Sequence, residues 1–88
     1  MDTYSVLIKK SAEKDLRKIP RAILPHIFEH IENLAAEPIP HDAYRLASAE
    51  QLYRIRVGDY RVIYQVLHEQ REVIVYYIRH RSIAYRGL

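Results

Sequence analysis

Arginine is the residue type best placed to do chemistry in this sequence of 88 residues. One short segment contains three of them, Arg54, Arg56 and Arg61. A second group near the C-terminus combines arginines with other polar rings: Arg79, His80, Arg81, Tyr85 and Arg86. The planar guanidinium group binds phosphate oxygens through two parallel hydrogen bonds and keeps its proton at every accessible pH. Together with a phenol or an imidazole that accepts a proton, such a set suits phosphoryl transfer by electrostatic stabilisation.

The charge of the chain is unevenly distributed. Overall, 14 Lys and Arg stand against 11 Asp and Glu, which gives a formal net charge of +3. Residues 1–44 hold four lysines, two arginines and seven acidic residues, so this half has a net charge of −1. Residues 45–88 hold eight arginines, no lysine and four acidic residues, so this half has a net charge of +4. The distribution favours an anionic partner for the C-terminal half.

Several classes of function lack the residues that they need. The chain has no Cys, which excludes thiol nucleophiles, disulfides and zinc ribbons and fits a reducing, cytoplasmic compartment. It has no apolar run long enough to span a membrane and no signal-peptide pattern. Residues 26–30 match the metallopeptidase pattern His-x-x-Glu-His, but we interpret them as the solvated face of a predicted helix. We therefore expect no metal and no other cofactor.

The hydrophobic pattern predicts one domain, residues 1–88, with elements in the order β-α-α-β-β-β. Residues 4–9 alternate as in a strand, and residues 11–19 and 22–36 follow the helical period, with Ser11 as the N-cap of the first helix. Residues 38–50 form a loop with a short strand near 44–46, and residues 52–57, 60–67 and 73–79 form strands. This order predicts an α+β fold, with a helical pair packed on one face of a largely antiparallel four-stranded sheet.

The two-residue loop Gly58-Asp59 fixes the register of the predicted hairpin, because such a loop pairs Arg56 directly with Arg61. Residues two apart on a strand share a face, so Arg54 projects with these two. The opposite face, beneath the helices, then receives a mainly apolar set: Tyr53, Ile55, Val57, Tyr60, Val62 and Tyr64. Two opposed arginines repel each other, so either an anion sits between them or they extend into water and pair with acids such as Glu50 and Glu69. Whether His80 or Arg81 joins this face depends on the length of the next turn and stays open.

Three segments resemble one known family. Residues 53–64 (Tyr-Arg-Ile-Arg-Val-Gly-Asp-Tyr-Arg-Val-Ile-Tyr), residues 78–81 (Ile-Arg-His-Arg) and the pair Tyr85-Arg86 resemble the RelE/ParE superfamily of type II toxins, and most closely its RelE branch. Residues 10–20 are similar to that family's first helix. The resemblance implies the fold predicted above, a metal-independent endoribonuclease that cuts mRNA in the ribosomal A site, and a RelB-like antitoxin as partner in a hetero-oligomer.

The resemblance also implies roles for individual residues. Arg61, Arg81 and Tyr85 match the family's catalytic arginines and tyrosine, and His80 stands where some members have Lys and others His. Four further arginines would bind the RNA: Arg54, Arg56, Arg79 and Arg86. Because Arg cannot give up a proton, the base is either Tyr85 or His80. The alternative implied by the same superfamily is a ParE-like protein that binds and inhibits DNA gyrase without an enzymatic reaction.

Overall fold

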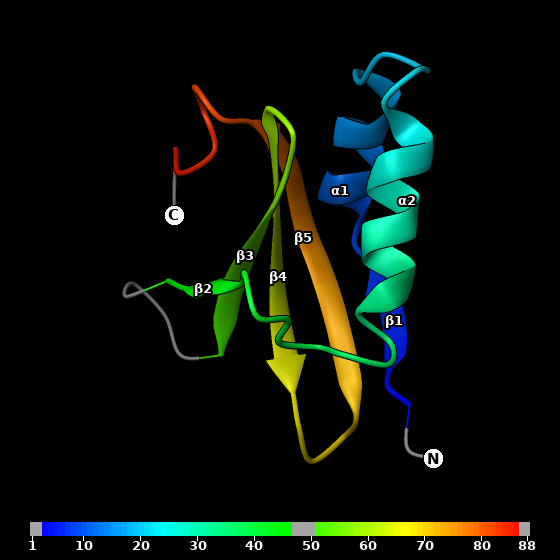
Figure 1. The fold of residues 1–88 in the computed structure, drawn as a ribbon, viewed down its shortest axis with the longest axis vertical. Helices are drawn as coiled ribbons and strands as arrows, with labels where there is room; N and C mark the ends of the chain where they lie inside the picture. Colours follow the sequence, from blue (N-terminus) through cyan, green and yellow to red (C-terminus); the bar gives the residue numbers. More distant parts are fainter. Residues whose placement is uncertain (1–2, 47–50, 87–88) are drawn as a thin grey trace.

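The computed structural model describes residues 3–46 and 51–86, which form two helices and a five-stranded sheet. The helices follow the first strand and precede the other strands, as Figure 1 shows. Along the chain the elements are β1 (Ser5–Ile8), α1 (Lys10–Arg17), α2 (Leu24–Asn33), β2 (Tyr44–Arg45), β3 (Leu52–Val57), β4 (Tyr60–Leu67) and β5 (Glu72–His80). The predicted α+β class is confirmed, and the elements begin and end within about three residues of the predicted positions.

The strands lie in the order β1-β5-β4-β3-β2, so the first and the last strand of the chain are neighbours. β1 runs parallel to β5, and all other pairs are antiparallel, which confirms a largely antiparallel sheet. The sheet has five strands where four were predicted, because the short strand expected near residues 44–46, β2, joins the sheet by pairing with β3 at its edge. This pairing brings the loop before β2 alongside the arginines of β3.

Both helices cover the same face of the sheet, and the core lies between them and the strands (Figure 1). The six hairpin residues predicted to face the helices all belong to this core or pack against it. Ser11 is not the N-cap of α1, which is Lys9. Instead, Ser11 and Asp15, one helical turn apart, contact the edge of β5: the Ser11 hydroxyl donates to the Tyr76 carbonyl at 2.5 Å, and Asp15 Oδ2 accepts the Ile78 N–H at 2.9 Å. α1 thus completes an edge of β5 that the short β1 leaves open.

β5 contains a bulge that decides which side chains it presents to each face. On the side of the β4–β5 turn, Tyr64 pairs with Val75. On the other side of a register shift between Ile63 and Tyr64, Arg61 pairs with Arg79. Between these two pairs β5 therefore holds one residue more than β4. Without the extra residue the same turn would pair Arg61 with Ile78. Because a shift of one residue exchanges the two faces of a strand, the bulge directs Ile78 into the core and Arg79 to the opposite face.

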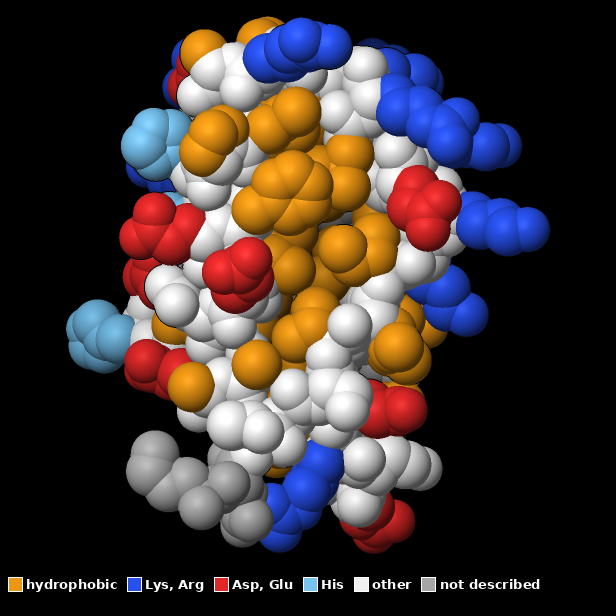
Figure 2. All heavy atoms as spheres, turned by 90° about the vertical axis from the view of Figure 1, so that its right-hand side faces the viewer, with side chains coloured by type: hydrophobic (Ala, Val, Ile, Leu, Met, Phe, Trp, Pro, Cys, Tyr) orange, Lys and Arg blue, Asp and Glu red, His pale blue; other side chains and the backbone are white. Residues whose placement is uncertain are grey.

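The outer surface of the two helices is not fully polar. Figure 2 shows a band of hydrophobic side chains on this side of the molecule, between borders of charged groups. The helical residues Leu16 and Leu24 stay partly exposed, and Phe28 is exposed to 40%. A contiguous apolar surface of this kind is typical of a face that another protein covers. Within the described residues, neither helix is long and apolar enough to cross a membrane.

Candidate active site

Four arginines from three strands project from the sheet face opposite the helices, which we call the arginine face: Arg54, Arg56, Arg61 and Arg79. The hairpin has the predicted register, with Arg56 opposite Arg61 and Arg54 opposite Ile63. On the next strand Arg79 lies opposite Arg61, so three guanidinium-bearing residues stand side by side across β3, β4 and β5. The prediction that the hairpin arginines share one face is therefore confirmed.

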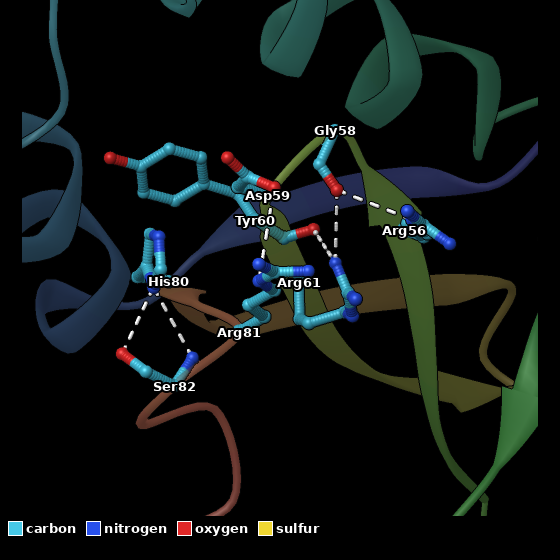
Figure 3. A network of polar contacts seen from close by, with 8 residues as sticks. All are labelled: Arg56, Gly58, Asp59, Tyr60, Arg61, His80, Arg81 and Ser82. Carbon is cyan, nitrogen blue, oxygen red and sulfur yellow. Dashed lines mark hydrogen bonds and ion pairs between the residues drawn. The ribbon is translucent and has the colours of Figure 1, made fainter.

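The hairpin turn holds the two opposed arginines in place. Arg56 Nε donates a hydrogen bond of 3.3 Å to the Gly58 carbonyl, and an Arg61 terminal nitrogen donates one of 3.1 Å to the same oxygen (Figure 3). The Arg61 group also donates to the Tyr60 carbonyl at 3.0 Å. Gly58 has a φ of +59°, a conformation that glycine adopts at little cost. The hairpin turn needs this conformation, and the Gly58 carbonyl of the same turn accepts the two hydrogen bonds. A shared carbonyl dipole thus offsets part of the repulsion between the two guanidinium groups.

Arg54 lies between two aromatic rings. Its guanidinium carbon is 4.4 Å from the centroid of the Tyr44 ring in β2 and 6.0 Å from that of the Tyr85 ring in the C-terminal turn. Both distances fall within the range of cation–π attraction. Because both rings are also exposed, at 62% and 47%, they offer flat surfaces to a ligand beside the cation.

The C-terminal turn, residues 81–86, closes over this face of the sheet. In Figure 1 it lies on the side away from the helices. Two residues outside the helix-covered core are nevertheless buried, Ile63 at 0% and Ala84 at 1%. Since Ile63 pairs with Arg54 and shares its face, its burial needs cover on that side, which the turn with Ala84 supplies. This packing brings Tyr85 to the arginines.

Arg79 is fixed by two contacts. Its guanidinium carbon lies 3.8 Å from the centroid of the Tyr77 ring, and one terminal nitrogen donates a 2.6 Å hydrogen bond to the Arg86 carbonyl. Arg79 thus connects the sheet to the C-terminal turn. Sequence reasoning missed Tyr77 here and Tyr44 beside Arg54. The spacing of the buried residues Val73, Val75 and Ile78 departs from period two and was the signal for the bulge that places Tyr77.

Of the two residues whose face the sequence left open, His80 does not lie on the arginine face, whereas Arg81 does. His80 pairs with Tyr60 on the face toward the helices, and the two rings meet edge to face at 5.7 Å between centroids. Arg81 follows the end of β5, and its backbone N–H donates to the Asp59 carbonyl at 2.7 Å, which continues the pairing of the two strands. Two residues after Arg79, it therefore lies on the same face, near Arg61 in Figure 3, and its Nε is 3.9 Å from Asp59 Oδ1. Both its side chain and that of Asp59 are more than half exposed.

Carboxylates do not neutralise the hairpin arginines in the part of the chain that the structure describes. Arg54, Arg56 and Arg61 form no ion pair with any acidic residue there. Of the two acids considered as partners, Glu69 makes no such contact, and Glu50 lies outside the described residues. The positive charge of this face is therefore available to a ligand.

A hollow of about 440 Å³ opens over the hairpin arginines. It is lined by Asp42 and Tyr44 in addition to Arg54, Arg56, Gly58 and Arg61. Asp42 lies in the loop before β2 and Tyr44 in β2 itself. This loop is anchored by the buried Tyr64 hydroxyl, which donates a 2.8 Å hydrogen bond to the Pro38 carbonyl. Burial raises the pKa of the Tyr64 phenol, so this group stays a donor. The hollow can take a phosphate group with guanidinium groups on several sides.

The His-x-x-Glu-His pattern on α2 does not form a metal site. His30 Nδ1 lies 2.7 Å from the carbonyl of His26, one turn earlier in the helix. Over residues 3–46 and 51–86, no group of three or more His, Asp or Glu side chains is arranged to hold a metal ion.

The sequence matches a protein family over residues 6–85, described as the ParE toxin of the type II toxin-antitoxin system, parDE. The chain belongs to the RelE/ParE superfamily of toxins. It is 37% identical to the protein named toxin RelE1 of Methanocaldococcus jannaschii, over 96% of this chain and 97% of the relative. It is 31% identical to toxin RelE of Mycobacterium tuberculosis, over 94% and 87% of the two chains.

Solved structures agree with this membership of the RelE/ParE superfamily. The toxin chain of the archaeal RelE–RelB complex from Pyrococcus horikoshii has a TM-score of 0.81 and 34% sequence identity, and the match covers 93% of this chain and 99% of that one. The predicted resemblance to the RelE/ParE superfamily is thereby confirmed. The chain is the toxin of a type II toxin-antitoxin system of the RelBE kind. The roles of the individual arginines, Tyr85 and His80 stay predictions.

Proposed function

We propose that this toxin is a metal-independent endoribonuclease that cleaves mRNA, with the ribosomal A site as the place of cleavage. The observation that supports this most is the convergence of four arginines and Tyr85 on one sheet face with no carboxylate pairing the hairpin arginines among the described residues. Unpaired guanidinium groups aimed at one hollow suit a substrate whose charge is concentrated on phosphate, and the adjacent rings of Tyr44 and Tyr85 suit its bases.

The proposed reaction is attack by the RNA 2′-hydroxyl on the adjacent phosphorus. The O2′–P bond forms while the P–O5′ bond breaks, and the products are a 2′,3′-cyclic phosphate and a 5′-hydroxyl. Tyr85, in its phenolate form, accepts the proton of the 2′-hydroxyl, and water supplies the proton that the 5′ oxygen takes up. Arg61 stabilises the charge that develops on the phosphoryl oxygens, and Arg54 and Arg56 hold the RNA backbone.

The geometry favours particular residues within this scheme. Tyr85 suits the base role better than His80, because Tyr85 lies beside Arg54 on the arginine face and His80 lies on the other face with Tyr60. Arg79 suits the second stabilising position better than Arg81, because Arg79 stands directly opposite Arg61. We therefore assign to Arg79 the charge-stabilising role that the family resemblance suggested for Arg81.

Mapping of RNA ends tests this function. After induction of the toxin in growing cells, we expect new 5′-hydroxyl ends within translated mRNA, and we expect Arg61→Ala and Tyr85→Phe to abolish both these ends and the toxicity. Purified toxin should cleave ribosome-bound mRNA equally well when a chelator has removed any loosely bound transition metal. Intact mRNA in cells that die, or full toxicity of both variants, would contradict the ribonuclease proposal.

Inhibition of DNA gyrase is the second candidate, because the family that matches residues 6–85 carries the ParE description. A gyrase inhibitor would act by binding and would not need Tyr85 or the unpaired arginines at one site. Supercoiling by purified gyrase in the presence of the toxin, together with a DNA-damage reporter in cells, distinguishes the two. Loss of supercoiling with mRNA intact would favour the gyrase proposal.

We also propose a RelB-like antitoxin as the partner that neutralises this toxin in a hetero-oligomer. The related Pyrococcus horikoshii toxin was solved as a complex with RelB. An acidic antitoxin segment would fit the arginine face, and apolar antitoxin residues would fit the band around Phe28 on the helices (Figure 2). Phe28→Asp should then weaken antitoxin binding while leaving mRNA cleavage unchanged.

A further inference from the structure

A second cavity, of about 400 Å³, lies at the end of the sheet where β4 begins and β5 ends. Part of its wall comes from the C-terminal end of α1, including Lys18, and part from the paired residues Tyr60 and His80. The next pair along the same strands is Arg61 with Arg79, whose side chains belong to the arginine face. The cavity and the candidate active site therefore lie on opposite faces of the sheet but meet at one end of it.

One wall of the cavity is formed by two aromatic rings in a fixed orientation. The Tyr60 and His80 rings stand at 87° to each other, and Figure 3 shows them together at the end of the hairpin. The Ser82 backbone N–H donates to His80 Nδ1 at 3.2 Å, and the Ser82 hydroxyl oxygen lies 2.9 Å from the same nitrogen. These contacts fix the orientation of the imidazole ring. A tyrosine and a fixed imidazole suit a flat ligand that stacks and accepts a hydrogen bond.

The charge around the cavity is positive. Three cationic residues contribute to its lining, Lys18, Arg79 and Arg86, against the single carboxylate of Asp15. That carboxylate already accepts the backbone N–H of Ile78 at 2.9 Å, so it is held at the edge of β5. A ligand for this cavity is thus expected to be both flat and anionic, which describes a nucleotide.

We propose that this cavity binds the nucleotide next to the cleaved phosphodiester of the RNA substrate, a proposal that rests on the ribonuclease function proposed above. The base lies against Tyr60 and His80, and its phosphate is bound by Lys18 and Arg86. Arg79 connects the two sites, because it lines the cavity and its guanidinium group donates to the Arg86 carbonyl beside the arginine face. The RNA backbone then bends around the end of the sheet, from the arginine face to the cavity.

The test uses paired variants at the rim of the cavity. Ile83 lines it and is 40% exposed, so Ile83→Glu and Ile83→Gln place side chains of nearly equal size there and differ in charge. Lys18→Ala removes a lining cation, and Lys14→Ala removes an exposed cation one turn earlier that does not line the cavity. The first measurement is the binding of purified toxin to an RNA oligonucleotide with a 2′-deoxy sugar at the mapped cleavage position. The second is cleavage of ribosome-bound mRNA.

We expect Ile83→Glu to weaken RNA binding about tenfold relative to Ile83→Gln, in line with the loss of one stacked base or one phosphate contact. Lys18→Ala should weaken it about threefold, and Lys14→Ala should not change it. In the cleavage assay Ile83→Glu and Lys18→Ala should raise KM and leave kcat unchanged, because they do not touch the reacting atoms, and Lys14→Ala should change neither.

The possible failures are distinguishable. If wild-type toxin cleaves mRNA and Arg61→Ala does not, but Ile83→Glu matches Ile83→Gln in both assays, the cavity proposal alone is wrong. If Ile83→Glu weakens binding of the antitoxin and not of RNA, the cavity is a protein contact and the proposal is likewise wrong. If wild-type toxin cleaves no RNA at all, the ribonuclease function fails and the cavity proposal fails with it.

Discussion

Replacing Arg79 with alanine is the sharpest test of the arrangement at the end of the sheet. The bulge in β5 places Arg79 directly opposite Arg61, whereas Arg81 lies beyond the strand. If Arg79 acts on the developing phosphoryl charge, its removal should cost about 3–4 kcal/mol of transition-state stabilisation, or a factor of about 10²–10³ in kcat. Without the bulge, Arg79 would face the helices and its removal would have no such effect.

Arg81→Ala provides the matched comparison. Its contact with Asp59 has an N–O distance of 3.9 Å, and the two side chains are 62% and 63% exposed. Exposed ion pairs of this kind contribute about 0–1 kcal/mol to stability. Even if all of this energy helped to order the turn for catalysis, the loss of the contact would lower the cleavage rate by less than about fivefold. We therefore expect the two alanine variants to differ at least about twentyfold in single-turnover cleavage of ribosome-bound mRNA.

A stability control separates catalysis from the anchoring of the C-terminal turn. Arg79 also donates to the Arg86 carbonyl, so Arg79→Ala removes one hydrogen bond that holds this turn. Urea unfolding should show a loss of about 1 kcal/mol, far less than the loss in rate implies. Arg79→Lys keeps the charge but not the planar fork and should retain an intermediate rate. The reasoning from register is wrong if Arg81→Ala impairs cleavage as severely as Arg79→Ala does.

Three further substitutions test the framework around the site. Asp15→Ala leaves the Ile78 N–H at the edge of β5 without its acceptor and should lower the free energy of unfolding by about 1–3 kcal/mol, measured by urea denaturation, with Lys14→Ala as a control that changes nothing. Gly58→Ala should cost about 1 kcal/mol through its positive φ alone, since an added Cβ meets no atom within 4 Å; an unchanged melting temperature would contradict this. Burial raises the pKa of the Tyr64 phenol above its unfolded value of about 10, so the wild-type free energy of unfolding should fall above about pH 10 by up to about 1.4 kcal/mol per pH unit. Tyr64→Phe should be about 1 kcal/mol less stable than wild type at pH 8, because the Pro38 carbonyl loses its donor. Its free energy of unfolding should not show the same fall above about pH 10. An equal fall in the two proteins would contradict the attribution of this pH dependence to Tyr64.

The hairpin could be predicted in detail because a two-residue loop leaves one register. Arg56 and Arg61 follow from that loop alone, and so does the burial of Tyr64 on the other face. The position of Arg79 could not be predicted in the same way, because counting back from the turn gives the wrong face when a bulge intervenes. In the sequence, the bulge is indicated only between Val75 and Ile78, where the alternation of buried side chains along β5 is interrupted.

Other features depend on contacts that no local pattern expresses. Ser11 has the right type and place for an N-cap, but its hydroxyl reaches the carbonyl of Tyr76, a residue 65 positions away. Tyr44 belongs to a strand of two residues, too short to show a period, and its place over Arg54 exists only because β2 pairs with β3. The Gly58 carbonyl that accepts hydrogen bonds from both opposed arginines is likewise a contact that no pattern of residue types shows.

The parallel pairing of β1 with β5 has a consequence for the timing of folding. Ser5 pairs with Glu72 and Ile8 with Val75, so the first strand to be synthesised has the last strand as its partner. Such a pairing closes nearly the whole chain into one loop, and domains fold as units once their residues are available. Arg79 and Tyr85 emerge later still. The sheet therefore closes, and the arginine face is assembled, only after β5 and the turn that carries Tyr85 have left the ribosome, so no part of the chain made earlier can form this face alone.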